Sequence, residues 1–369
     1  MNQKLFSTPD SHEYYKGNVR WISSGELNYN KIFDTIEHIS QKAVRNTNLR
    51  VHQPGTFLMA ITGLEAEGTR GRCAIVGAPA TTNQSCLAIN GTERMCTEYL
   101  FWFYRMWGQY LAFKYCQGTK QQSYTASIVR NLPIYGPKYI VEQQTIAEAL
   151  SDVDRLIAAL DKKIAKKKLI KQGAMQQLLT GKKRLPGFTA PWEEKKLGEI
   201  LDYEQPQPYL VVSTDYVDSG IPVLTAGKSL ILGYTTEQFG VYNNLPVIIF
   251  DDFTTASKYI SYPFKIKSSA MKILILKNTN YDLRLVYELM QQIDFPLKDH
   301  QRYWISEYSQ MKIYLPKDKR EQTAIARVLT EMDREIADLE AKRNKYCLLR
   351  SGMMQKLLTG QIRLKINRI

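Results

Sequence analysis

The chain has 369 residues, and its 50 Lys and Arg outnumber its 36 Asp and Glu, which gives a formal net charge of +14 at pH 7. This length is typical of two or three domains, and the basic balance favours a polyanionic partner such as nucleic acid. No apolar run reaches the roughly 18 residues that a membrane-spanning helix needs, and no apolar segment follows a basic start, so we expect neither a membrane partner nor a secretory signal. The five cysteines show no metal-ligand spacing and fit buried thiols in a reducing cytoplasm, where we expect the protein to be.

The first region, residues 1–136, has the pattern of an α+β domain. The apolar run 56–61 predicts a buried strand. The aromatic-rich stretch 98–110 predicts an amphipathic helix.

A heptad pattern follows Pro137 and predicts a long helix within the segment 137–186. Apolar residues recur there at alternating steps of four and three, which is the a/d spacing of a coiled coil. Gly181, after Leu-Leu-Thr, is placed to end the helix, which gives it about 40 residues and a length of roughly 60 Å. The apolar seam consists of Ile146, Leu150, Val153, Ile157, Leu160 and Ile164.

The same segment carries a run of lysines. A charge run of this kind is usually a solvated helix face, and the alternative is a face turned toward DNA or an acidic partner. The run consists of Lys162, Lys163, Lys166, Lys167, Lys168 and Lys171.

The second region, residues 187–315, opens with the linker 187–191 and again has a mixed pattern. The runs 247–250 and 272–276 predict buried strands. Asp251 and Asp252 follow the first of these strands, and since no acid-x-Lys arrangement comes after them, a turn is favoured over a nuclease carboxylate pair.

The last segment, residues 316–369, repeats the helical segment. Residues 142–185 align without gaps with residues 321–364 at a constant offset of 179, and about half of the paired positions are identical. Upstream the offset persists more weakly and then vanishes. Gly360 is placed to end this second helix. Its apolar seam consists of Ile325, Leu329, Met332, Ile336 and Leu339.

Two long helices with a shared register have two ways to bury their seams. Each can pack on its neighbouring domain, or the two can pair with each other, and their equal length favours pairing. An antiparallel pair would place the two domains at opposite ends. The expected fold class is therefore α+β, with two α/β-mixed domains separated by two long helices that pair as an antiparallel coiled coil in a pseudo-two-fold internal repeat.

The sequence lacks the residue constellations that enzymes use. Its four histidines form no metal-ligand pair. Gly220 stands seven residues before Gly227, Lys228 and Ser229, whereas a phosphate-binding loop needs a spacing of about five. A glycine-rich dinucleotide fingerprint and the Asn-Pro-Pro-aromatic motif of adenine methyltransferases are also missing. We therefore expect a non-catalytic protein that uses no metal and no cofactor.

Several motifs resemble those of the specificity (S) subunits of Type I restriction-modification systems. Both repeated segments carry Pro, then Glu-Gln, then Ile-Ala-x-x-Leu, then Asp, and then Leu-Leu-Thr-Gly followed by Arg. Residues 192–200 resemble the Trp-x-x-x-x-Leu-Gly-Glu-Ile opening of a target recognition domain in that family. Residues 14–27 and 118–124 resemble its early and late recognition-domain motifs.

This resemblance implies that each target recognition domain reads one half of a bipartite site in double-stranded DNA. It further implies that the paired helices set the gap between the halves and dock two modification (methyltransferase) subunits, which restriction subunits join in the full complex. The first domain lacks the Trp opening of the second, so its opening strand is expected to be missing or supplied elsewhere. The alternatives are a truncated, inactive specificity subunit and a coiled-coil scaffold without sequence-specific DNA binding.

Polar and basic loops of the two domains supply the candidates for DNA contact. Lys and Arg bind phosphates, while Arg reads guanine and Gln reads adenine in the major groove. Tyr124 and Tyr303, which are equivalent under the repeat, suit packing at least as well as DNA contact. The candidates are Arg70, Arg72, Lys120, Gln121 and Gln122 in the first domain, and Lys228, Lys258, His300, Gln301 and Arg302 in the second.

Overall fold

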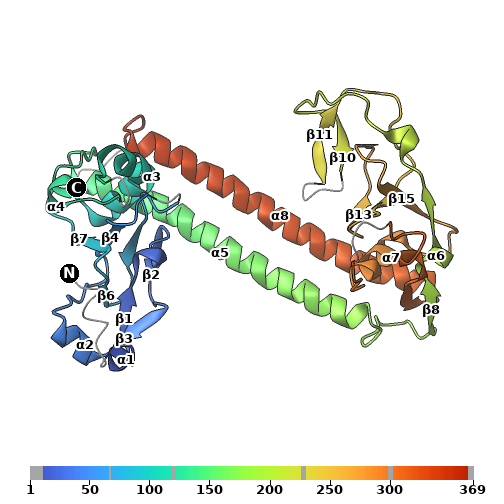
Figure 1. The fold of residues 1–369 in the computed structure, drawn as a ribbon, viewed down its shortest axis with the longest axis horizontal. Coiled ribbons are helices and arrows are strands. Elements are labelled where there is room, and N and C mark those ends of the chain that lie inside the picture. The colour runs from blue at the N-terminus through green and yellow to red at the C-terminus, as the bar shows by residue number, and fades with distance from the viewer. Residues whose placement is uncertain (1–10, 66–67, 119–121, 226–229, 298–301, 365–369) are drawn as a thin grey trace. The chain divides into compact units, whose positions relative to one another are not determined.

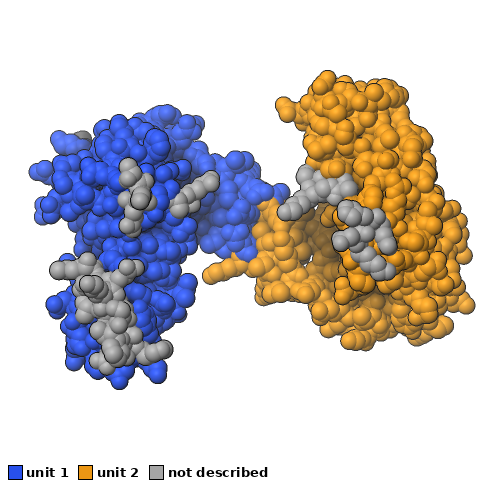
Figure 2. All heavy atoms as spheres, in the orientation of Figure 1, with its two compact units in different colours: residues 1–161, 341–369 blue, residues 162–340 orange. Residues whose placement is uncertain are grey.

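The computed structural model describes residues 11–65, 68–118, 122–225, 230–297 and 302–364. Contacts within the chain divide it into two compact units (Figure 2). Unit 1 contains residues 1–161 and 341–369, and unit 2 contains residues 162–340. Each of the two long helices therefore contributes one end to each unit (Figure 1).

Unit 1 combines short strands with one longer helix. Outside the two long helices, its described elements are α1 (Ser11–Tyr14), β1 (Val19–Ile22), η2 (Ser24–Glu26), β2 (Asn30–Ile32), β3 (Glu37–Ile39), α2 (Gln41–Asn46), β4 (Phe57–Ala60), β5 (Cys73–Val76), β6 (Ala80–Thr82), β7 (Cys86–Ile89), α3 (Thr97–Tyr115) and α4 (Ala126–Arg130). One sheet has the order β2-β5-β4-β7, and a second has the order β3-β1-β6. The strand predicted at 56–61 is confirmed as β4, and all four of its residues are buried.

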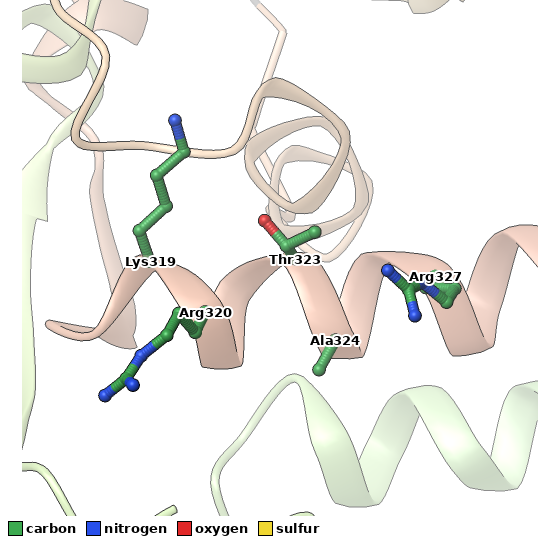
Figure 3. Close-up of a pocket in the computed structure, with 5 residues that line it drawn as sticks. All are labelled: Lys319, Arg320, Thr323, Ala324 and Arg327. Carbon is green, nitrogen blue, oxygen red and sulfur yellow. The ribbon is translucent and has the colours of Figure 1, made fainter.

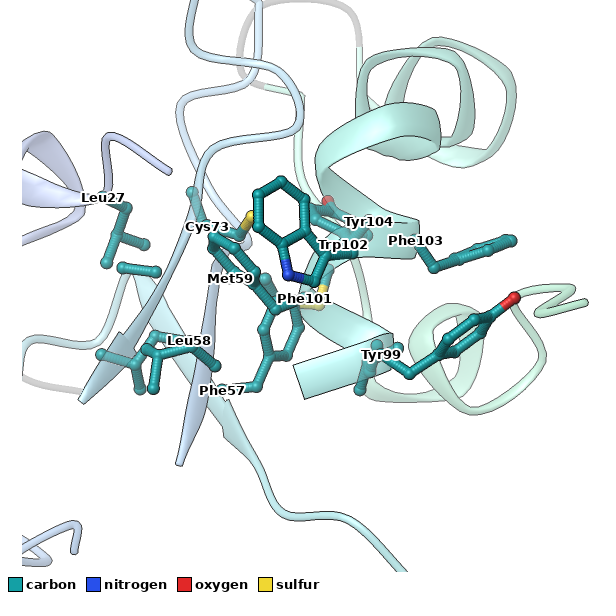
Figure 4. Close-up of a cluster of buried hydrophobic side chains, with 14 of the residues drawn as sticks. Leu27, Phe57, Leu58, Met59, Cys73, Tyr99, Phe101, Trp102, Phe103 and Tyr104 are labelled. Atoms are coloured by element: carbon teal, nitrogen blue, oxygen red, sulfur yellow. The ribbon is translucent and has the colours of Figure 1, made fainter. Parts of the chain in front are cut away.

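The helix predicted at 98–110 is confirmed as α3, but it is buried over more than one face. Six consecutive residues from Tyr99 to Tyr104 are buried, because α3 packs against β4 and β5 and also reaches the first long helix. The Phe57 ring lies edge-on to the Tyr104 ring at 5.7 Å (Figure 4). The indole Nε1 of Trp102 donates a hydrogen bond of 3.1 Å to Ser151 Oγ on the long helix. This aromatic core joins the domain to the helix.

Unit 2 is built on a four-stranded antiparallel sheet. Outside the long helices, its described elements are β8 (Trp192–Lys196), α6 (Leu197–Ile200), β9 (Leu201–Glu204), η3 (Gln207–Tyr209), β10 (Ile221–Leu224), β11 (Ile231–Thr235), β12 (Val247–Asp251), β13 (Ser257–Ile260), β14 (Lys265–Ile266), β15 (Met271–Leu276), α7 (Leu283–Met290), η4 (Tyr308–Gln310) and β16 (Lys312–Pro316). The main sheet has the order β13-β12-β15-β9, beside a β11-β10-β14 sheet and a β16-β8 pair. The strands predicted at 247–250 and 272–276 are confirmed as β12 and β15.

The two predicted long helices are confirmed. The first, α5, spans Ile140–Leu178 with 39 residues, and the second, α8, spans Lys319–Leu358 with 40. Gly181 and Gly360 follow them with φ angles of 69° and 75°, a left-handed conformation that glycine adopts without steric cost. Among the described residues, no helix is long and apolar enough to cross a membrane.

The long helices pack against each other, and the ion pairs between them show the relative direction of the two helices inside each unit. In unit 1, Arg350 bonds to Asp154, and Arg343 bonds to Asp161 at 3.0 Å. In unit 2, Lys171 bonds to Asp333 at 2.5 Å, and Lys167 bonds to Glu335 at 2.8 Å. In both units residue numbers rise along one helix as they fall along the other, so the packed segments run in opposite directions.

The two packing options for the apolar seams are both used. Ile146 and Leu150 belong to one buried cluster that contains residues of α3 together with Leu357 and Leu358 of α8. Leu329 belongs to the corresponding cluster in unit 2. Of the expected seam residues, those that are buried are Ile146, Leu150, Ile157, Leu160, Ile164, Ile325, Leu329 and Ile336, and those that are partly buried are Val153, Met332 and Leu339.

The units differ at the strand that opens the second domain. In unit 2, β8 pairs with β16 from Trp192 opposite Pro316 to Lys196 opposite Lys312. In unit 1 the segment equivalent to β16, residues 133–137, is not a strand, and no β8-like strand pairs with it among the described residues. Tyr135, the equivalent of Tyr314, is 71% exposed there.

Candidate nucleic-acid interface and its joints to the helices

The repeated Glu-Gln pair forms the joint between each domain and its helix. Gln143 is buried at the start of α5, where its Oε1 accepts a hydrogen bond of 2.8 Å from the backbone N of Cys96. Its Nε2 donates to the carbonyl oxygens of Arg94 at 2.9 Å and Pro137 at 2.8 Å. One side chain therefore bonds three backbone groups, one of which is the buried amide of Cys96.

Gln322 repeats this arrangement at the start of α8. Its Oε1 accepts a hydrogen bond of 2.9 Å from the backbone N of Asp282, and its Nε2 donates to the Pro316 carbonyl at 2.7 Å. Asp282 caps α7 by accepting from the backbone N of Arg284 and Leu285. The joint thus fixes the start of α7 to the start of the long helix.

The glutamates of the two pairs bind the tails that follow the opposite helix. Arg363 donates to both carboxylate oxygens of Glu142 at 2.6 Å, and Arg184 donates to both oxygens of Glu321 at 2.5 Å. The hydrogen bonds from Arg363 lower the pKa of the Glu142 carboxyl, and the same contact raises the pKa of the Arg363 guanidinium. A bidentate Arg-carboxylate pair fixes geometry as well as charge.

A second repeated contact lies further along the helices. Asp154 binds Arg105 of α3 at 3.2 Å and also Arg350 of α8. Asp333 binds Arg284 of α7 at 2.7 Å. Its other partner is a lysine of α5, as described above. Each aspartate therefore ties its own domain to both long helices.

The DNA-binding candidates of unit 1 meet at one loop cluster. Arg70, in the loop between β4 and β5, donates from its Nη2 to Gln122 Oε1 at 3.1 Å and lies over the ring of Phe113. The backbone N of Gln122 donates to a carboxylate oxygen of Glu65 at 2.9 Å. Arg72 donates from Nε to the Gly68 carbonyl at 2.7 Å. These three candidates lie together, and each already has partners within the unit.

In unit 2 the two described candidates both belong to the β12–β13 hairpin region. Arg302 is exposed, and its guanidinium lies 5.8 Å from the ring centroid of Phe253 at the hairpin turn. Lys258 is exposed on β13, opposite Ile249 of β12. The remaining candidates lie outside the described residues, and they are Lys120, Gln121, Lys228, His300 and Gln301.

Tyr124 and Tyr303 are packing residues in their units. Both side chains are buried, Tyr124 in the cluster of unit 1 and Tyr303 in that of unit 2. The backbone N of Tyr124 donates to the Ile61 carbonyl, and that of Tyr303 donates to the Asp252 carbonyl. Their equivalence under the repeat therefore reflects core packing.

The lysine run of α5 divides into two groups. Lys167, Lys168 and Lys171 form ion pairs with carboxylates of α8. Lys162, Lys163 and Lys166 are exposed and make no ion pair within the part of the chain that the structure describes. The first group holds the helices together, and the second group has its charges uncompensated by any ion pair among the described residues.

Asp251, the last residue of β12, and Asp252, which follows it, serve the local fold. Asp251 accepts from the backbone N of Phe253 at 3.0 Å, and Asp252 accepts from the backbone N of Trp304 at 2.8 Å. Both carboxylates are buried, and the residues described contain no group of three or more ligating side chains suited to a metal ion.

Burial raises the pKa of the Cys86 thiol to about 12, which keeps it protonated near neutral pH.

A basic groove that the sequence did not single out lies on the first turns of α8 (Figure 3). It has a volume of about 460 Å³ and is lined by Lys319, Arg320, Thr323, Ala324 and Arg327. Lys319 donates to the Thr279 carbonyl, and Arg320 pairs with Asp318. Arg327 is the exposed cation of the groove that makes no ion pair among the described residues. A Lys-Asp-Lys-Arg run at 317–320 was the only signal for it in the sequence.

Residues 2–169 and 190–346 each match the family described as Type I restriction modification DNA specificity domain. These two matches cover most of the chain, and the chain therefore belongs to this family. It carries two matches to the family domain, and each match runs into one of the long helices, the first into α5 and the second into α8.

Two curated proteins are similar in sequence. The specificity subunit of the Type I restriction enzyme EcoR124I/EcoR124II from Escherichia coli is 44% identical over 182 residues, which is 46% of this chain and 45% of that protein. The MjaIX specificity subunit from Methanocaldococcus jannaschii is 26% identical over 261 residues, 65% of this chain and 58% of that protein. The matched parts thus span about half the length of these relatives.

The fold is similar to that of a solved structure. The crystal structure of a Type I restriction-modification S subunit from M. genitalium superposes with a TM-score of 0.68, covering 100% of this chain and 92% of that one at 14% sequence identity. At this identity the likeness concerns the fold alone.

Proposed function

We propose that this protein is the DNA-specificity subunit of a Type I restriction-modification complex and reads a bipartite site in double-stranded DNA. One observation carries the proposal: the two family matches contain domains of different sequence, and each domain is attached to one copy of the repeated helix through the same Gln143 or Gln322 joint. Two different recognition domains that are attached in the same way fit a DNA site with two different halves. The chain's net charge of +14 supplies the affinity for a polyanion.

We assign the parts as follows. Residues 1–136 and 187–315 are the two target recognition domains, and residues 137–186 and 316–369 are the conserved helical segments. The helices pair along their length as an antiparallel coiled coil and act as a ruler that sets the unread base pairs between the half-sites. A helix of 39 or 40 residues has a length of roughly 60 Å, which is between one and two DNA turns.

DNA contact in this proposal comes from the loop cluster of unit 1 and the hairpin region of unit 2. Exposed cations such as Lys258 and Arg302 bind phosphates, and Arg or Gln side chains read base edges. Arg70 and Gln122 exchange their mutual hydrogen bond for contacts with bases when DNA binds. The candidates outside the described residues, Lys120, Gln121, Lys228, His300 and Gln301, belong to the same proposal.

The chain itself is non-catalytic in this proposal and binds no cofactor. Two modification subunits supply S-adenosylmethionine and the adenine methylation chemistry, and restriction subunits join them in the full complex. The buried and internally bonded state of Asp251 and Asp252 supports this view, because neither carboxylate is available to a metal or a substrate.

The test is to map methylated adenines in the genome of the host with and without this gene. We expect deletion to remove one split adenine-methylation motif with a fixed unread gap, and re-expression to restore it. An unchanged methylome in a host that makes the protein together with its modification subunit would contradict the proposal. Salt-dependent duplex binding by the purified complex separates this function from a scaffold that does not bind DNA.

A further inference from the structure

The segment 33–36 of unit 1 presents two apolar side chains to the solvent. It crosses from β2, in one sheet, to β3, in the other. Ile36 is 86% exposed, the largest fraction of any large apolar side chain in the described part of the chain, and Phe33 is 60% exposed. Single exposed apolar residues are common on protein surfaces and need no explanation by themselves. What sets this segment apart is the way in which its backbone is held.

Polar side chains of unit 1 hold the backbone beside Ile36. One carboxylate oxygen of Glu26 accepts a hydrogen bond of 2.9 Å from the backbone N of Ile36, and the other accepts from the backbone N and the hydroxyl of Ser23, each at 2.9 Å. Leu27, which follows Glu26, is buried in the core of the unit (Figure 4). Thr35 is buried, and its hydroxyl accepts from one backbone N at 3.3 Å and donates to one backbone carbonyl at 2.7 Å. The exposed isoleucine is therefore mounted on a well-anchored backbone.

The same anchoring connects this segment to the candidates for DNA contact. Arg72 of the loop cluster donates from Nη1 to the carbonyl of Gly25 at 3.4 Å, and Gly25 directly precedes Glu26, whose carboxylate holds the segment. On the other side, the Nζ of the exposed Lys31 lies 5.7 Å from the ring centroid of Phe33. The exposed apolar side chains thus belong to a basic surface that continues from the loop cluster.

We propose that Ile36 contacts the C5-methyl group of one thymine, in the major groove of the half-site that unit 1 binds. This methyl is the apolar group that base edges present in the major groove, and it marks thymine among the four bases. A β-branched side chain on an anchored backbone loses little conformational freedom when it covers such a group. The inference rests on the proposed function, which also supplies the thymine, because each methylated adenine pairs with one.

The test replaces each thymine of the recognised sequence in turn by deoxyuridine, which lacks only the C5-methyl group. The affinity of the labelled duplexes is measured by fluorescence anisotropy, with the chain in the complex that the proposed function assigns to it. For the unaltered chain we expect one of these replacements to weaken binding about fourfold through the loss of the Ile36 contact, which is the effect of one buried methyl group. The variant Ile36→Ala should bind the thymine and deoxyuridine duplexes of that position with equal affinity.

Two further variants serve as controls. Ile36→Val keeps a branched aliphatic side chain and should keep most of the preference for thymine. Val212→Ala is the matched control in unit 2, where Val212 is 75% exposed and its backbone N likewise donates to a glutamate, Glu237, at 3.1 Å. It should keep the full preference at the thymine that Ile36 contacts. The Ile36 side chain is exposed, so thermal unfolding of the chain should not change in either Ile36 variant.

The possible results separate this inference from the proposed function. A preference for thymine that persists undiminished at every position in Ile36→Ala, or no preference at any thymine in the unaltered complex, would overturn the inference and leave the proposed function standing. Loss of a subunit from the Ile36→Ala complex would assign the side chain to a protein interface and also overturn it. An unaltered complex that binds duplexes without regard to their sequence would overturn both.

Discussion

Arg363 and Glu142 are 221 residues apart in the sequence and form two hydrogen bonds of 2.6 Å between the tail after α8 and the start of α5. Arg184 and Glu321 form the same bidentate pair in unit 2. The start of each long helix is therefore tied to its own domain through its glutamine joint and to the tail of the other helix through its glutamate.

The first prediction concerns acid. The folded-state pKa of Glu142 lies below its usual value of 4.5, so the pair stabilises the fold at pH values above that value, and this contribution is lost as pH falls through the lowered pKa. We expect hydrogen exchange of the amides around 358–364 to be slow near pH 6 and, after correction for intrinsic rates, to quicken below about pH 4.5. In Glu142→Gln the exchange should be fast already at the higher pH, and a tail with equal protection in both proteins would refute this.

The second prediction concerns the glutamine joint. Gln143→Leu keeps the volume but leaves the backbone N of Cys96 and the carbonyls of Arg94 and Pro137 without their partner. We expect a loss of about 3 kcal/mol in the unfolding free energy of unit 1, measured by denaturant-dependent hydrogen exchange of α3 amides. Gln322→Leu is the matched variant, which frees two backbone groups rather than three and should cost unit 2 less.

The third prediction compares the two aspartates. Asp154→Asn leaves Arg105 and Arg350 without a carboxylate in a partly buried place, and we expect a cost of about 2 kcal/mol in unit 1. Asp333→Asn should cost unit 2 less, because Arg284 keeps a second carboxylate, Glu288, at 2.6 Å. Equal losses in the two units would show that the second carboxylate does not compensate.

The fourth prediction concerns DNA affinity. Arg302→Ala removes an exposed cation, and we expect weaker binding to the cognate duplex. The slope of the logarithm of the binding constant against the logarithm of the salt concentration should also become smaller by about one. Arg155→Ala is the control, because Arg155 is an exposed arginine of α5 paired with Asp152. The measurement is fluorescence anisotropy of a labelled duplex at several salt concentrations, with the chain in the complex that the proposed function assigns to it. Equal affinity for both variants at all salt concentrations would remove Arg302 from the interface.

The long helices could be predicted from the sequence because heptad spacing and a terminating glycine are local signals. The pairing of β8 with β16 could not, since Trp192 and Pro316 are brought together only by the fold of the whole second domain. The same reason limits the prediction of DNA contacts. Arg72 looks like a free loop cation in the sequence, yet it donates to the carbonyls of Gly68 and of Gly25, which is 47 residues away.

The glutamine joint has a consequence for how such a protein can change. Gln143 bonds to the domain through the backbone atoms of Arg94 and Cys96, and Gln322 bonds through the backbone N of Asp282. A contact made with backbone atoms does not depend on which side chains those positions carry. A recombination event that replaces the coding region of one domain by another of the same backbone shape would therefore leave the attachment intact. Under the proposed function, the cell would acquire a new DNA sequence specificity from a single exchange of gene segments.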